Sequence, residues 1–132
     1  MVPPSTRTRR TRSELAGCLL ALAQEMLRRA GRTRQNCANT MIRWKQIIED
    51  RPDRGMASLL AEGLKLLTEE LTPQEQADLR PEWDQAWGEY GAISARPLNM
   101  TAVEQAHRTR QRELRPRGRP PAEKRQRKVT KT

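Results

Sequence analysis

The chain has 132 residues, of which 26 are Lys or Arg and 16 are Asp or Glu, so its net charge is +10. With 35% hydrophobic and 3% aromatic residues, the composition argues against a large ligand pocket, because such pockets are lined mostly by apolar and aromatic side chains. A single His and two Cys without a CxxC spacing exclude the usual zinc sites, which need about four nitrogen or sulfur ligands, so we expect no enzyme, no cofactor and no small-molecule substrate.

The first twelve residues form a basic arm without acidic residues or apolar periodicity, which predicts a disordered segment. Alternating Arg and Thr can bind phosphates, or bind RNA as an arginine-rich segment that folds on contact. The alternative is a solubilising tail. The candidate binding residues of this arm are Arg7, Arg9, Arg10 and Arg12.

A first helix is predicted from the capping-box spacing of Thr11 and Glu14 to about Ala30, with Gly31 as its stop. Two neighbouring apolar stripes merge into a broad face that other helices must bury. The leucines of this face, and those of the leucine-rich helix expected at about 54–71, could also support a homodimer, as in many DNA-binding helical proteins.

A second helix is predicted over residues 34–50, with Trp44 on its apolar stripe. A loop is expected at 51–55, followed by a third, leucine-rich helix over about 54–71. Residues 28–54 carry eight Lys or Arg and three acidic residues, whereas residues 55–100 carry three Lys or Arg and eight acidic residues. The first of these halves could face a polyanion and the second would be repelled by one.

The threonine and proline of Thr72-Pro73-Gln74-Glu75 indicate another helix start. We expect a short helix to about Leu79 and a new one from Pro81, because the residue before a proline avoids the helical region. The second short helix would place Trp83, Trp87 and Tyr90 on one face. Packing in the core or at a protein interface is the favoured interpretation of these aromatics, since acidic neighbours would repel phosphates.

The last predicted helix covers residues 101–114 and is rich in arginine and poor in apolar residues. On it, His107 is expected at the surface. The remaining residues, 116–132, are basic, lack periodicity and are expected to be disordered. The fold class predicted from these elements is all-α, a small bundle of about four to six helices, with arms at 1–12 and 116–132, a helical domain at 13–100 and a basic helix at 101–115.

Residues Arg117-Gly118-Arg119-Pro120 in the tail resemble the AT-hook core. The resemblance implies that Arg117 and Arg119 enter the narrow minor groove of A·T-rich DNA, where the negative potential is enhanced. The glycine lets the backbone lie close to the groove floor, and the flanking prolines keep the segment extended. A generic polybasic tail is the alternative, because the motif is short.

Residues 15–49 resemble a helix-turn-helix, with Thr33 as the cap of the recognition helix. The resemblance implies that Arg34, Gln35 and Asn39 reach base edges, since Arg suits guanine and Asn or Gln suits adenine. Cys37 would fill the buried position of that helix. The sequence departs from the pattern at Arg32 and Thr40, where apolar residues are usual, and an ordinary helical hairpin is the alternative.

We therefore expect a non-enzymatic nucleic-acid-binding protein of regulatory type that binds DNA rather than RNA. One alternative is an assembly or adaptor protein with an acidic, Trp-bearing partner surface, and another is an RNA-binding component of a ribonucleoprotein particle. Beyond the first arm, the expected binding residues are Arg34, Gln35, Asn36, Asn39, Arg43, Arg108, Arg112, Arg115, Arg117, Arg119, Lys124, Arg125, Arg127 and Lys128.

No segment has the ~18 apolar residues needed to span a bilayer, and two cysteines without an evident partner suit a reducing compartment. We therefore expect no membrane partner and a cytoplasmic or nucleoid-associated protein. Arg9 and Arg10 before an apolar run at 15–23 loosely resemble an export signal. Import into an organelle is a further open alternative.

Overall fold

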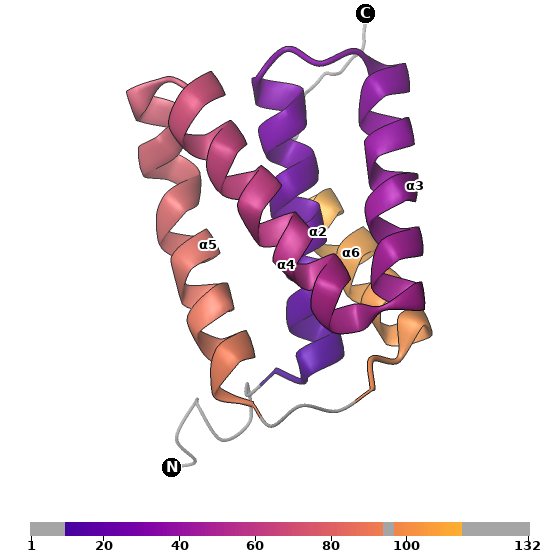
Figure 1. The fold of residues 1–132 in the computed structure, drawn as a ribbon. Coiled ribbons are helices and arrows are strands. Elements are labelled where there is room, and N and C mark those ends of the chain that lie inside the picture. Colours follow the sequence, from indigo (N-terminus) through magenta and orange to yellow (C-terminus); the bar gives the residue numbers. More distant parts are fainter. Residues whose placement is uncertain (1–9, 94–96, 115–132) are drawn as a thin grey trace, which may run out of the picture.

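The computed structural model describes residues 10–93 and 97–114, which form an all-α bundle without strands (Figure 1). The predicted fold class is confirmed. Its elements are α2 (Arg12–Arg29), α3 (Arg34–Asp50), α4 (Pro52–Lys65), the π-helical turn η1 (Leu66–Glu70), α5 (Pro73–Ala92) and α6 (Met100–Leu114). Arg7, Arg9, Arg115, Arg117, Arg119, Lys124, Arg125, Arg127 and Lys128 lie outside the described residues.

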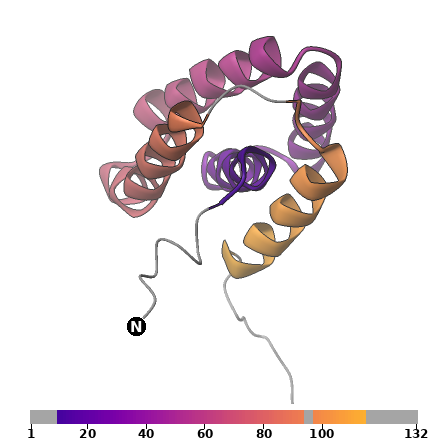
Figure 2. The same ribbon diagram turned by 90° about the horizontal axis from the view of Figure 1, so that it is seen from below.

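Helix α2 occupies the centre of the bundle. Figure 2 shows it enclosed by an arc of the other four helices. All residues from Leu15 to Ala23 are buried, as expected for a helix that is apolar on most of its circumference. The leucines of α2 are therefore buried within a single chain.

Helix α6 packs closely along α2 because small residues face each other. A Cβ at Gly17 would come within 2.6 Å of the Ala106 Cβ, so glycine is needed there for the helices to approach. The expectation of a surface His107 was wrong. Its side chain is buried, and its Nε2 lies 2.6 Å from Oε1 of Gln24.

The predicted helix starts are confirmed at three threonines. The side chains of Thr11, Thr33 and Thr72 each accept a hydrogen bond from a backbone N–H three residues on. Gly31 has a φ of 84°, which permits the sharp turn between α2 and α3 because glycine has no Cβ to clash there.

Helix α4 begins at Pro52, so the expected loop at 51–55 was wrong. Proline is tolerated in the first turn, where its missing N–H would have no helical partner. The chain therefore passes from α3 to α4 through Arg51 alone. The last turn of the predicted third helix is η1, and its Leu66 and Leu67 are buried.

Helix α5 runs without interruption through Pro81, so the expected break there was also wrong. Its two halves stay in line because Leu79, Trp83 and Tyr90 are all buried against the rest of the bundle. Gly63 of α4 makes room for the Trp83 ring, which a Cβ at that position would overlap. Core packing of the aromatics is confirmed, with ring centroids of Trp83 and Trp87 5.6 Å apart.

Candidate nucleic-acid interface

The five binding residues predicted on α3, namely Arg34, Gln35, Asn36, Asn39 and Arg43, are all exposed on the helix. They come together because the apolar stripe of α3, with Met41, Trp44 and Ile48, turns the opposite side of the helix to solvent. Most of these side chains have a polar partner within the chain.

Gln35 donates to Oδ1 of Asn39 at 3.0 Å, and Asn36 accepts from Arg32 at 3.2 Å. Arg43 forms an ion pair with Glu62 of α4 at 2.8 Å. Arg34 has no ion pair among the described residues and remains available for an external anion.

Helices α2 and α3 lie side by side and run antiparallel, as both ribbon views show (Figures 1 and 2). The helices of a helix-turn-helix instead cross at about 90–120°. The α2–α3 unit is therefore a helical hairpin, and α3 is not presented as a recognition helix of that class. The Thr33 cap is confirmed, and Cys37 is half-buried.

Two residues predicted in the first arm are bound to the bundle instead. Arg10 pairs with Glu89 of α5 at 2.9 Å, and Arg12 is the first residue of α2, with its guanidinium 4.2 Å from the centre of the Tyr90 ring. Hydrogen bonding to Arg10 lowers the pKa of the Glu89 carboxyl. These contacts fix the start of α2 on α5, at the opposite end of α2 from Arg34.

On α6, Arg108 and Arg112 are exposed. Arg108 donates to Glu104 at 3.0 Å, and Glu104 also accepts from Lys45 of α3 at 2.7 Å. This network joins α3 to α6. Arg112, in the last turn of α6, has no ion pair within the described part of the chain.

The charge of the molecule is divided sharply. The described residues hold fifteen Lys or Arg and fifteen Asp or Glu, so the whole net charge of +10 lies in residues 1–9, 94–96 and 115–132. Eleven of the fifteen described cations have a carboxylate within 4.0 Å. The four exceptions are Arg34, Arg54, Lys65 and Arg112.

A groove of about 530 Å³ lies between α2, the start of α3 and the end of α6. We call it the arginine groove. Three of its lining residues are Arg28, Arg32 and Arg34, and its apolar lining includes Ala21, Cys37 and Leu114. Its carboxylate, Glu25, accepts from Arg28 and from Arg29.

Burial alone would raise the pKa of Glu25, but the hydrogen bonds from Arg28 and Arg29 outweigh burial and hold its pKa below the ordinary value. Arg28 and Arg32 were not among the binding residues predicted from the sequence. Their basic character was visible, but their convergence with Arg34 depends on the antiparallel placement of α2 and α3.

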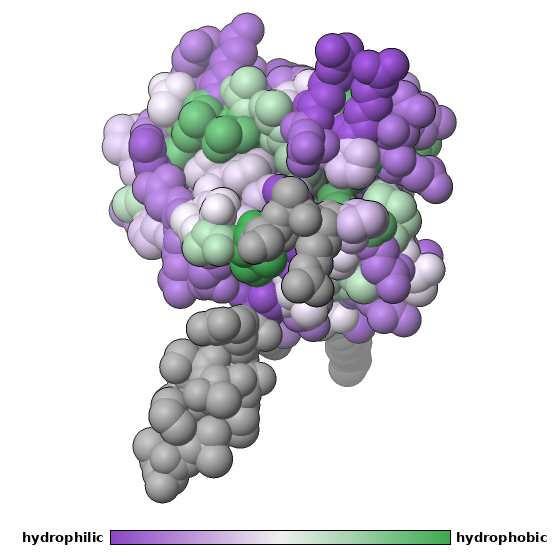
Figure 3. All heavy atoms as spheres, turned by 60° about the horizontal axis from the view of Figure 1, so that its bottom comes forward, coloured by the Kyte–Doolittle hydropathy of each residue, from purple (hydrophilic) through white to green (hydrophobic). Residues whose placement is uncertain are grey.

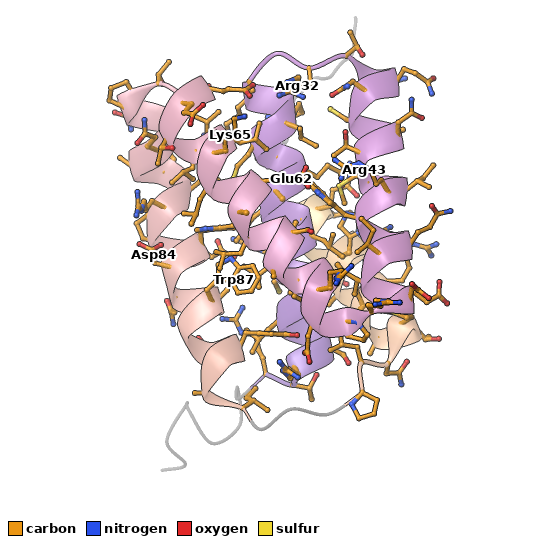
Figure 4. All side chains as sticks on the ribbon, viewed as in Figure 1. Arg32, Arg43, Glu62, Lys65, Asp84 and Trp87 are labelled. Atoms are coloured by element: carbon orange, nitrogen blue, oxygen red, sulfur yellow. The ribbon has the colours of Figure 1, made fainter. Side chains whose placement is uncertain are left out.

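A second groove, on the α4 side of α3, has mixed charge. Arg43 and Glu62 reach toward each other across the gap between α3 and α4 (Figure 4). Lys65 and Glu70 also line this groove, and Glu70 pairs with Arg32 at 2.8 Å. Its two carboxylates are both ion-paired, and they leave its lining with a smaller excess of positive charge than the lining of the arginine groove has.

The face drawn in Figure 3 is largely hydrophilic, with apolar side chains in small separate patches. Within residues 10–93 and 97–114, no three His, Cys, Asp or Glu side chains are grouped in a way that could hold a metal ion. None of the helices described is long and apolar enough to cross a membrane.

No protein-family model, curated protein or solved structure matches the chain.

Proposed function

We propose that the protein is a non-enzymatic nucleic-acid-binding protein whose terminal basic segments supply the affinity for DNA. The observation that carries this proposal is the division of charge between a neutral bundle and the segments outside it, of which residues 1–9 and 115–132 together hold +9 of the net +10. Cations that neutralise phosphates release condensed counterions, which is the main source of affinity in sequence-independent binding. The bundle then acts as the body to which these segments are attached.

The choice of DNA over RNA rests on Arg117-Gly118-Arg119-Pro120. In a hook of this kind the two arginines lie along the minor groove of A·T-rich duplex, which is narrow and strongly negative. The minor groove of an A-form RNA duplex is wide and shallow, so the same segment would find no matching groove there.

The adaptor alternative is less well supported. The aromatic residues of its proposed partner surface pack in the core, since Trp83 and Tyr90 are buried. Several acidic groups of residues 55–100 also have arginine partners within the chain, including Glu70, Asp78 and Glu82. The ribonucleoprotein alternative uses the same basic segments and is separated by the experiment below.

The experiment compares the full chain with a chain of residues 10–114, which keeps every described helix. Each is titrated against labelled A·T-rich duplex, G·C-rich duplex and structured RNA by fluorescence anisotropy. We expect the full chain to bind A·T-rich duplex most tightly and the trimmed chain to lose most of this affinity. Tightest binding to RNA would favour the ribonucleoprotein alternative, and equal weak binding to all three would contradict the proposal.

A further inference from the structure

We propose that the arginine groove binds the phosphodiester backbone of the duplex that the C-terminal tail engages. The proposal rests on the proposed function and adds a second contact to it, made by the folded bundle. The groove, between α2, the start of α3 and the end of α6, brings together Arg28, Arg32 and Arg34.

The charge of this groove favours an anion more than that of the other grooves described. Its carboxylate, Glu25, is buried and already bound by two guanidiniums, with Arg28 Nη2 at 2.5 Å and Arg29 Nε at 2.8 Å from Oε2. The arginine groove holds three cations and this one carboxylate, whereas the groove beside α4 holds three cations and two carboxylates, Glu62 and Glu70, of which Glu70 pairs with Arg32. The groove between the start of α2 and α6 carries Glu14 and Glu113.

Arg34 is the residue best placed to meet a phosphate. It is exposed in the first turn of α3, a turn that contains no acidic residue. The free N–H groups at a helix start carry partial positive charge, so the guanidinium and the helix end repel each other until an anion is present. An external phosphate would relieve this repulsion and would not have to displace an internal carboxylate.

The tail begins at the edge of the same groove. Leu114, the last residue of α6, lines the groove together with Arg34. Arg117 follows three residues later, so it can lie at most about 10 Å from Leu114. A duplex held by Arg117 and Arg119 is therefore within reach of the arginines of the groove.

The apolar part of the groove provides a direct probe. Cys37 is half-buried in the groove lining. Cys18 lies on the groove between the start of α2 and α6 and serves as an internal control. Burial raises the pKa of the Cys18 thiol, so its alkylation is expected to be slow and unaffected by a ligand in the arginine groove.

The first experiment measures iodoacetamide alkylation at both cysteines of the full chain by mass spectrometry, with and without saturating A·T-rich duplex. We expect the duplex to slow alkylation of Cys37 severalfold and to leave the Cys18 rate unchanged. Poly-glutamate is tested in parallel. If poly-glutamate protects Cys37 and bound duplex does not, the groove binds an acidic polypeptide and the proposal is overturned.

The second experiment uses a matched pair of variants in the full chain. Arg34→Gln removes the groove cation that has no ion pair among the described residues, and Arg54→Gln removes an exposed cation of the first turn of α4 that likewise has none there. We expect Arg34→Gln to reduce the slope of log affinity against log salt by about one, as for the loss of one phosphate contact. Arg54→Gln should leave the slope unchanged.

The outcomes separate the two proposals. If the full chain binds duplex but Cys37 stays reactive and Arg34→Gln keeps the wild-type slope, binding by the tail stands and the groove contact is refuted. If the full chain fails to bind duplex at low salt, both proposals fail together.

Discussion

The imidazole of His107 on α6 lies against the side-chain amide of Gln24 on α2, with Nε2 2.6 Å from Oε1. The amide oxygen can only accept, so Nε2 is the donor in this hydrogen bond. Burial, reinforced by the positive charge of Lys45, lowers the pKa of His107 from 6.5 to about 4. We therefore expect the contact between α2 and α6 to weaken as the pH falls.

The sign of this dependence follows from the lowered pKa. Protonation is disfavoured in the folded state, so stability is complete above the unfolded pKa of 6.5 and is lost as the pH falls toward 4. Between pH 7.5 and pH 5 we expect the free energy of unfolding to fall by about 2 kcal/mol, since one pKa unit corresponds to ~1.36 kcal/mol.

Urea denaturation followed by circular dichroism at both pH values measures this change. The His107→Gln variant is the control, because it cannot titrate. A variant that retains the full pH dependence would show that another group is responsible.

The close contact between Gly63 and the Trp83 ring gives a second prediction. Gly63→Ala places a methyl group where it would overlap the indole, and overpacking of this kind lowers stability by about 1–3 kcal/mol. Gly88→Ala on α5 is the matched control, because its Cβ would meet nothing within 4 Å. That substitution should raise stability by up to about 1 kcal/mol through helix propensity. Thermal unfolding of both variants tests the prediction, which fails if Gly63→Ala is neutral.

A third prediction concerns α6, which contributes Val103 and His107 to the buried interior. A chain that ends at residue 100 exposes the side of α2 that α6 covers, including Gly17 and Gln24. We expect this chain to unfold at a markedly lower temperature than a chain that ends at 114. Equal melting temperatures would show that residues 13–100 form a domain without α6.

The helices were predictable where strong local signals mark both ends. The predicted bounds of α3 agree with the structure because Thr33 caps its start and Pro52 opens the next helix after Arg51. The continuity of α5 through Pro81 was not predictable in the same way. It depends on the burial of Trp83 and Tyr90 against distant segments, which a local proline rule does not include.

The candidate site was predictable in part. The exposure of Arg34 and Asn39 followed from the apolar stripe of α3. The direction of α3 relative to α2 did not follow from the sequence pattern, because it is set by how the surrounding helices pack around α2. The partners of Arg10 and Arg12 within the chain were also not predictable from the sequence, because Glu89 and Tyr90 lie more than seventy residues away.

The hook-like segment gives a fourth prediction. Replacing both Arg117 and Arg119 by Ala removes the two side chains expected in the minor groove. We expect the preference for A·T-rich over G·C-rich duplex to disappear, because the remaining basic residues contact phosphates, which carry no sequence information. Replacing both Lys128 and Lys131 by Ala removes the same amount of charge. This variant should bind the A·T-rich and the G·C-rich duplex more weakly, and by the same factor. A preference retained by the arginine variant would refute the hook.

The central claim is that the segments outside the neutral bundle carry the binding. The most direct test is the salt dependence of duplex binding, measured for the full chain and for residues 10–114 between roughly 50 and 200 mM salt. For the full chain we predict a steep fall of log affinity with log salt, with a contribution of about 0.9 to the slope from each phosphate neutralised. For residues 10–114 we predict a shallow slope. Equal slopes for the two chains would place the binding in the bundle and contradict this account.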